Sequence, residues 1–171
     1  MLITISLFAI ITINTAIINA QNVGIIPVPR EIEYSNQQVM ADGFSSIAIS
    51  PNITELSEHS VTELQNDILE YVNISLNILK YGEEDKKQMN IYVGNPDTDP
   101  FIKKLMDEYG LTLDDKMRKE GYVLGTGNKG IVIGAVSDAG ILYGTKSLKQ
   151  MALHCTESWT DGYISLPHVK I

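Results

Sequence analysis

Apolar residues recur along this chain at two spacings, one typical of strands and one typical of helices. In the segment 44–50, Ile47 and Ile49 alternate with Ala48, which is the period of a half-buried strand. The segments 31–34 and 90–93 are also predicted to be short strands. Pro27 and Pro29 precede the first of these and predict an extended entry segment, because each proline fixes its own φ.

The first helix is predicted to begin at Ser57 or Ser60 and to end near Tyr71. Ser60 followed by Glu63 forms a capping-box pattern, in which each side chain accepts a hydrogen bond from a free backbone N–H. The apolar residues of this segment fall on one helical face: Val61, Leu64, Ile68 and Val72.

A second helix is predicted from Asp99-Pro100 to Tyr109. Asp99 is a good N-cap acceptor, proline is favoured in the first helical position, and Gly110 suits a left-handed C-terminal cap. Its expected buried side is formed by Phe101, Ile102, Leu105 and Tyr109.

The segment 120–150 predicts a hairpin followed by a helix. Strands at 122–126 and 131–135 flank a turn, Gly127-Asn128-Lys129-Gly130, in which Asn and Gly accept positive φ. Ser137 or Asp138 caps the last helix. The buried stripe of that helix is predicted to be Ile141, Gly144, Leu148, Met151, Ala152 and Cys155. Because Gly140 and Gly144 carry no side chain, this helix is expected to lie close to the sheet.

Together these elements predict one α+β domain. We expect a mixed or mostly antiparallel β-sheet of about five to seven strands, covered by helices on one face. The helices at 60–71 and 137–154 are expected to form the main cover. The chain has 171 residues, of which 44% are hydrophobic and 20% charged, which fits a single foldable globular domain.

Charge and cysteine content exclude several functional classes. The net charge is −8 and the sequence pI is about 4.8, so nucleic-acid binding through clustered Lys and Arg is not expected. Cys155 is the sole cysteine and excludes an internal disulfide. In a secreted protein an odd cysteine is either buried or paired with a partner outside the chain.

Residues 1–20 carry no charged side chain and are rich in Ile and Leu, which predicts a signal peptide. Ala16 or Ala20 supplies the small residue before a cleavage site. The alternative is a retained membrane anchor, because the run is nearly long enough to span a bilayer and lacks an N-terminal Lys or Arg. With the leader cleaved, the protein is expected in the secretory pathway, secreted or lysosomal, and not in a membrane.

Two N-glycosylation sequons agree with a secreted glycoprotein. They are Asn52-Ile53-Thr54 and Asn73-Ile74-Ser75, and their acceptor residues are predicted glycosylation sites in a eukaryotic host.

Three segments carry a resemblance to a known family. Residues 120–150 read EGYVLGTGNKGIVIGAVSDAGILYGTKSLKQ, the entry segment contains Pro27 and Pro29, and residues 166–171 read LPHVKI. This wording resembles the N-terminal, non-catalytic domain that precedes the catalytic barrel in family 20 β-N-acetylhexosaminidases. The resemblance spans about residues 22–171 and implies that the barrel, which would follow Ile171, is absent from this chain. The α-glucuronidases and hyaluronidase-type enzymes carry N-terminal domains of similar build.

No residue is predicted to be catalytic. Asp107-Glu108 is an Asp-Glu pair of the kind that the family uses, where the Glu protonates the leaving oxygen and the Asp orients the acetamido group of the substrate. Here the pair lies in KKLMDEYG, near the end of a short predicted helix. Adjacent helical positions point about 100° apart, so the two carboxylates would not converge on one sugar. We therefore interpret them as solvated surface charge.

No cofactor or metal site is predicted either. Gly125, Gly127 and Gly130 match GxGxxG, but a second strand follows in place of the helix that a dinucleotide site requires, so a hairpin is favoured. His59, His154 and His168 lack zinc-site spacing. The acidic runs at 83–85 and 114–115 would hold a cation only if further oxygen ligands converged on them, and are interpreted as solvated charge.

Two functional hypotheses follow. The first is an accessory domain of a secreted β-N-acetylhexosaminidase, which removes terminal N-acetylhexosamine residues in carbohydrate metabolism. This domain lacks catalytic residues, and its partner is the catalytic barrel, through which alone it meets glycans. The alternative is a stand-alone secreted module that binds a glycan or a protein. Trp159, Tyr163 and Ile164 are the predicted domain-docking residues.

Overall fold

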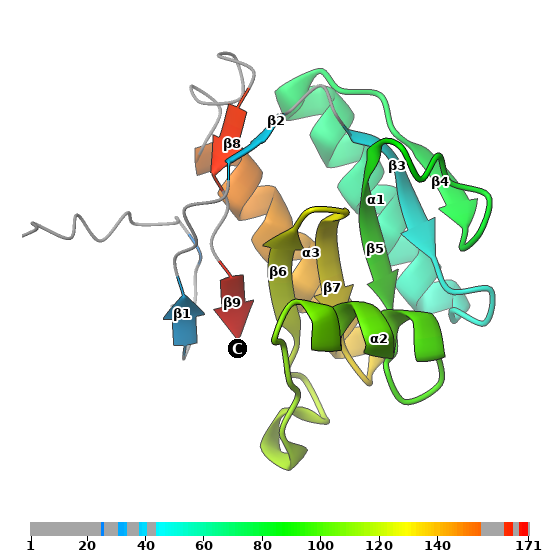
Figure 1. Ribbon diagram of the computed structural model, residues 1–171, viewed down its shortest axis with the longest axis vertical. Coiled ribbons are helices and arrows are strands. Elements are labelled where there is room, and N and C mark those ends of the chain that lie inside the picture. Colours follow the sequence, from blue (N-terminus) through cyan, green and yellow to red (C-terminus); the bar gives the residue numbers. More distant parts are fainter. Residues whose placement is uncertain are drawn as a thin grey trace, which may run out of the picture.

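The computed structural model describes residue 25 and residues 31–33, 38–40, 44–154, 163–165 and 168–170. Seven strands form one sheet, in the order β1-β9-β6-β7-β5-β3-β4, and β2 pairs with β8 separately (Figure 1). The strands are β1 (Glu31–Glu33), β2 (Gln38–Met40), β3 (Phe44–Ile49), β4 (Asn77–Lys80), β5 (Met89–Gly94), β6 (Val123–Gly127), β7 (Gly130–Gly134), β8 (Tyr163–Ser165) and β9 (His168–Lys170). The predicted signal peptide and Cys155 lie outside the described residues.

The sheet is mixed, which confirms the α+β class and decides between the two predicted sheet types. Strands β4, β3, β5 and β7 run parallel, whereas β6, β9 and β1 each pair antiparallel with their neighbours. Strands β2, β4 and β8 were not predicted from the sequence. The parallel strands β3, β5 and β7 are buried along nearly their whole length. Parallel strands covered on both faces have this character.

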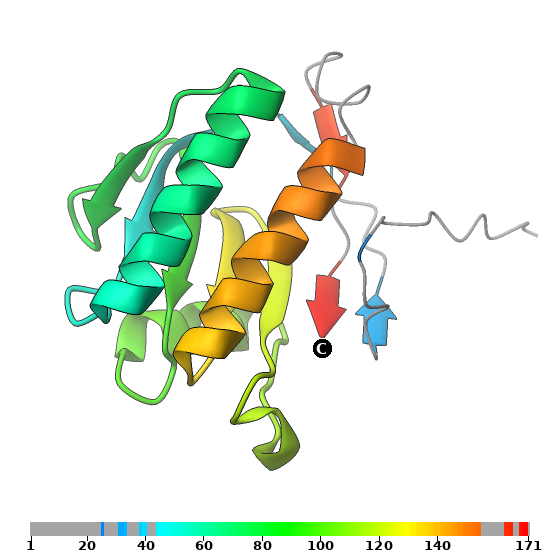
Figure 2. The same cartoon turned by 180° about the vertical axis from the view of Figure 1, so that it is seen from behind.

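Two long helices cover one face of the sheet, as predicted, and a short helix lies on the opposite face. Helices α1 (Glu55–Val72) and α3 (Asp138–His154) lie side by side behind the sheet, and α2 (Pro100–Glu108) lies in front of it (Figures 1 and 2). A 3₁₀ turn occupies Asp115–Met117. Each face has its own apolar core, with Ile47, Leu64 and Ile133 in the larger and Val132 and Leu105 in the smaller. Among the described helices, none combines the length and apolarity needed to cross a membrane.

The predicted capping box of the first helix is wrong. Helix α1 begins at Glu55, and Thr54 is its N-cap, with a hydroxyl that accepts a hydrogen bond from Ser57 N at 3.1 Å. Ser60 therefore lies inside the helix, where its hydroxyl donates to Leu56 O. Asn73 ends the helix in a left-handed conformation with φ of 59°. Both sequon asparagines, Asn52 and Asn73, thus flank α1 and are exposed.

The predicted capping of the second helix is confirmed. The Asp99 carboxylate accepts from the backbone N–H groups of Phe101 and Ile102, Pro100 follows it, and Gly110 has φ of +68°. Ile102 and Leu105 are buried as expected, and Met106 joins them. Phe101 is partly exposed and packs on Tyr81, with ring centroids 4.9 Å apart.

The hairpin interpretation of the glycine-rich segment is confirmed. Strands β6 and β7 pair in register from Val123–Gly134 to Gly127–Gly130. Gly130 alone in this turn takes positive φ, whereas Asn128 does not adopt the expected left-handed conformation. Gly125 and Gly127 make room for neighbours, because a Cβ at either position would collide with the side chain of Leu111 or Tyr109. The glycines of the GxGxxG motif therefore allow close packing of Leu111 and Tyr109 against the hairpin.

Helix α3 lies against the sheet as closely as its glycines predicted. A Cβ at Gly144 would lie 2.5 Å from Cγ2 of Ile133, and one at Gly140 would lie 2.6 Å from the carbonyl oxygen of Gly121. Ser137 caps the helix, since its hydroxyl accepts from Gly140 N at 3.1 Å. The predicted stripe is buried in its described part: Ile141, Gly144, Leu148, Met151 and Ala152.

Replacing Gly144 by Ala tests this close approach. Alanine normally favours a helix over glycine by about 1 kcal/mol. At this position the added methyl would push against Ile133, so we expect a net loss of about 1–3 kcal/mol in the free energy of unfolding. Urea unfolding followed by circular dichroism measures it. Asn66→Ala, at an exposed position of α1, is the control and should be neutral or slightly stabilising.

Buried tyrosines predict a loss of stability in alkali. Burial raises the pKa of Tyr122 to about 12, as it does for Tyr109, and raises the pKa of Tyr81 further. The folded state favours the neutral phenol, so this stabilisation is complete below the unfolded pKa of about 10 and is lost as the pH rises towards 12. Urea midpoints should therefore fall between about pH 10 and pH 12. Tyr122→Phe should flatten that slope, because phenylalanine cannot ionise, and an unchanged slope would contradict the assignment.

Candidate functional site

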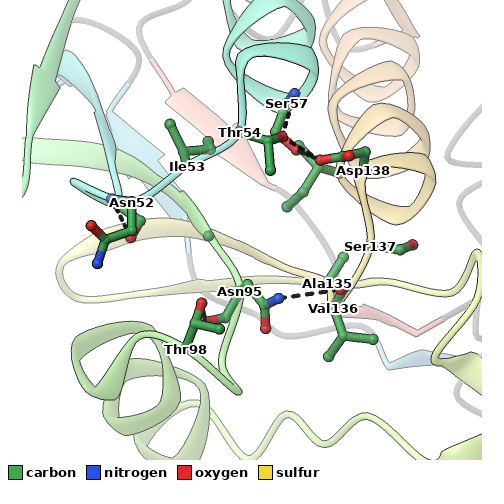
Figure 3. A pocket seen from close by; sticks show the side chains of 13 residues that line it. Asn52, Ile53, Thr54, Ser57, Asn95, Thr98, Ala135, Val136, Ser137 and Asp138 are labelled. Atoms are coloured by element: carbon green, nitrogen blue, oxygen red, sulfur yellow. Dashed lines mark hydrogen bonds between the residues drawn. The ribbon is translucent and has the colours of Figure 1, made fainter.

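A pocket of about 320 Å³ lies at the carboxyl ends of three parallel strands. It is lined by residues that follow β3, β5 and β7 and by the first residues of α1 and α3 (Figure 3). After β3 the chain passes through α1, on one face of the sheet, to β4 at the sheet edge. After β5 it passes through α2, on the opposite face, towards β6 and β7 in the other direction along the sheet. In open sheets, ligands bind outside the carboxyl ends of strands at such a change of direction.

Three side chains join the two helix starts at this pocket. The Asp138 carboxylate accepts hydrogen bonds from the hydroxyls of Thr54 and Ser57, the latter at 2.6 Å (Figure 3). Thr54 also caps α1. Sequence reasoning identified Asp138 only as a possible cap of its own helix. Thr54, ahead of a first turn containing Glu55 and Glu58, was the signal that was missed.

Asn95 and Ser137, also in the lining, hydrogen-bond to the backbone of other segments. Asn95 donates to Val136 O at 3.2 Å and accepts from Asp97 N at 2.9 Å. The Ser137 hydroxyl donates to Lys119 O at 2.5 Å. The apolar part of the lining comprises Ile53, Ala135, Val136 and Ile141. Among the 13 lining residues Asp138 carries the single formal charge, so the pocket holds no pair of acid and base and no cationic group.

Asp107 and Glu108 lie on α2, on the opposite face of the sheet from α1 and α3. Asp107 pairs with Lys103, and Glu108 pairs with Lys129 at 2.5 Å and with Lys104 at 4.0 Å. The hydrogen bond from Lys129 lowers the pKa of Glu108. A general acid needs a raised pKa, so this environment is the opposite of a proton donor's.

The sequence predicts that the acidic run at 83–85 is solvated charge, and for Glu84 this prediction is wrong. Glu84 is buried, and its carboxylate accepts from Gly82 N at 2.6 Å, which fixes the turn after β4. Asp85 accepts from Lys87 N, and Asp114 likewise accepts from Lys116 N and Met117 N. In the part of the chain that the structure describes, no three His, Cys, Asp or Glu side chains gather where they could hold a metal ion.

The outer surface of α1 and α3 combines ion pairs with exposed apolar side chains. Lys146 pairs with Glu63 at 2.9 Å, and Lys149 pairs with Asp67 at 2.7 Å. The pKa of Glu63 is lowered by the hydrogen bond from Lys146, and that of Lys149 is raised by the hydrogen bond to Asp67. Of the six large apolar side chains exposed among the described residues, five lie on these two helices: Leu56, Leu69, Tyr71, Tyr143 and Leu153. We call these five the helical apolar surface.

The structure describes only part of the predicted docking residues Trp159, Tyr163 and Ile164. Tyr163 and Ile164 belong to β8, whose backbone pairs antiparallel with β2. Their side chains and the whole of Trp159 lie outside the described part. Asn52 lines the pocket, and Asn73 ends α1. The structure therefore brings one predicted glycosylation site to the pocket.

The sequence matches one family model along most of its length. Residues 22–171 match glycosyl hydrolase family 20, domain 2. The chain belongs to this family. No curated protein matches the sequence.

Solved structures share the fold of this family 20 domain at low identity. CpGH84D is 16% identical with a TM-score of 0.65, over 85% of this chain and 23% of its own. The GH20 β-N-acetylhexosaminidase from Streptomyces coelicolor is 16% identical with a TM-score of 0.53, over 75% and 22%. The GH20 exo-β-N-acetylglucosaminidase from Vibrio harveyi is 17% identical with a TM-score of 0.50, over 75% and 16%. The chain thus spans less than a quarter of the length of each of these three proteins.

Thr54 is expected to stabilise the pocket through its cap and its bond to Asp138. Thr54→Ala removes both contacts and should lower the free energy of unfolding by about 1–2 kcal/mol. Thr54→Ser keeps the hydroxyl and is the matched control. Urea unfolding of unglycosylated protein measures both variants, so that loss of the sequon plays no part. Equal stability of the two variants would show that the hydroxyl contributes nothing.

Proposed function

We propose that this family 20 domain is the accessory domain of a secreted β-N-acetylhexosaminidase that removes terminal N-acetylhexosamine residues. The match of residues 22–171 to domain 2 of the family carries this proposal. In the proposed enzyme the catalytic acids come from the barrel, and glycans reach the domain through it. Secretion is supported by the apolar leader at 1–20 and by the exposed sequon residues Asn52 and Asn73.

In this proposal the helical apolar surface packs against the barrel. These five exposed side chains lie on two neighbouring helices, and exposed apolar side chains of this size can form an interaction surface. The ion pairs between α1 and α3 lie on the same two helices and hold them together beneath the partner. Trp159, Tyr163 and Ile164 remain part of the proposed interface.

The transcript beyond the codon for Ile171 tests the function directly. The family's catalytic Asp-Glu pair lies in an HxGGDE-like motif of the barrel. A reading frame that continues into such a motif would establish the domain as the leading part of a hexosaminidase. A stop codon at that point would overturn the enzyme assignment. The stand-alone secreted module that binds a glycan or protein would then become the working function.

The isolated chain should release no chromophore from a 4-nitrophenyl N-acetylglucosaminide. The described residues that resemble the catalytic pair, Asp107 and Glu108, are held by lysines on a short helix, and the pKa of Glu108 is lowered. The assay uses purified, homogeneous protein over the pH range of about 4 to 8, where hexosamine chemistry by a carboxylic acid would be seen. Turnover that scales with protein concentration and survives further purification would contradict the proposal.

Substitutions on the helical apolar surface test the docking. In the enzyme that contains the barrel, Leu69→Asp and Tyr143→Asp place charges on this surface. We expect the single thermal transition of the docked protein to split into two, because the domain and barrel would unfold independently. Lys104→Asp, at an exposed position on α2, is the control and should leave one transition. A single transition in all three variants would place the interface elsewhere.

A further inference from the structure

The pocket at the strand ends has features that suit one class of ligand. Its volume of about 320 Å³ falls at the low end of the range for ligand pockets, which is about 300–1,000 Å³. It is framed by the ends of buried strands and by two helix starts, and hydrogen bonds hold the side chains of Ser57, Asn95 and Asp138 in place. It is therefore preformed and sized for a small ligand.

Charge at the pocket is balanced. The N-termini of α1 and α3 both lie in its lining, and each contributes a partial charge of about +0.5. Asp138, in the same lining, carries one full negative charge. An anion would be repelled by this carboxylate, and a cation by the two helix ends. The electrostatics thus favour a neutral ligand.

The lining is chemically mixed in the way that a sugar requires. Its apolar residues offer contact to the C–H groups of a pyranose ring. The Asp138 carboxylate and the side chains of Ser50, Asn52 and Thr98 offer hydrogen-bond partners for hydroxyl groups. A nucleotide or phosphate would meet the Asp138 carboxylate, and the lining has no cationic side chain to offset that repulsion.

We propose that this pocket binds one neutral pyranose sugar unit. Asn52, which lines the pocket and begins a sequon, gives two possible sources of that sugar. One is the first N-acetylglucosamine of a glycan attached to Asn52 itself, and the other is a free sugar or the end of a separate glycan. The site is distinct from the helical apolar surface, so its occupation does not depend on the enzyme assignment.

Nuclear magnetic resonance tests the proposal with the unglycosylated, ¹⁵N-labelled chain. Titration with N-acetylglucosamine should give saturable shifts of the backbone amides of Asn95, Ser137 and Asp138. Inorganic phosphate and calcium chloride should shift none of them. Val136→Trp fills the pocket at a half-buried lining position and should weaken sugar binding at least tenfold. Thr98→Arg is a second blocking variant at an exposed position, in case the first fails to fold.

The glycosylated chain distinguishes the two sources. The glycan on Asn52 is trimmed enzymatically to one N-acetylglucosamine, and Asn52→Gln is the control that lacks it. If the attached sugar fills the pocket, the trimmed protein shows the bound-state amide shifts and takes up no added sugar. If it does not, the trimmed protein still binds free sugar. Absence of saturable sugar shifts, or equal binding by both blocking variants, would overturn the proposal.

Discussion

The close contact between α3 and the sheet is the constraint on which the rest of the helical layer depends. Gly140 and Gly144 allow the helix to lie where a methyl group would collide with Gly121 and Ile133. At this depth the first residue of α3, Asp138, reaches the hydroxyls of Thr54 and Ser57 at the start of α1. The two helices are therefore joined at their starts by this carboxylate and further along by lysine–carboxylate pairs. The close approach of α3 to the sheet therefore also places Asp138 at the pocket.

The same helical layer presents two surfaces of different character. At the helix starts, Asp138 offsets the partial positive charges of two helix ends, which leaves a pocket that is polar and close to neutral. Along the outer surface, exposed apolar side chains lie on the same helices as the partly exposed ion pair between Lys146 and Glu63. Exposed ion pairs contribute little stability, typically about 0–1 kcal/mol each. The ion pairs therefore add charge to a helical layer that also exposes large apolar side chains.

Local signals allowed part of this fold to be predicted, and non-local pairing explains the rest. The Asp99-Pro100 start, the Gly110 cap and the β6–β7 hairpin depend on neighbours in sequence, and all three are confirmed. The start of α1 was misplaced because Ser60 with Glu63 imitates a capping box. The acidic first turn after Thr54 was a local signal for the true start, and Thr54 also donates to Asp138, 84 residues away, a contact that local sequence does not reveal. The parallel pairing of β3, β5 and β7, whose carboxyl ends form the pocket, likewise cannot be predicted from the local sequence pattern.

The environment of Asp107 and Glu108 differs from that of a glycosidase's catalytic pair. A general acid of a glycosidase needs a carboxyl whose pKa is raised, as in an apolar or crowded acidic site. Glu108 has the reverse environment, because Lys129 donates to it and lowers its pKa. Three buried polar side chains are hydrogen-bonded within the domain: Tyr122 to Ser147 of α3, Glu84 to Gly82 N in the turn after β4, and Asn90 of β5 to Ser46 of β3. These buried polar groups of the described residues therefore stabilise the fold, through hydrogen bonds within the domain.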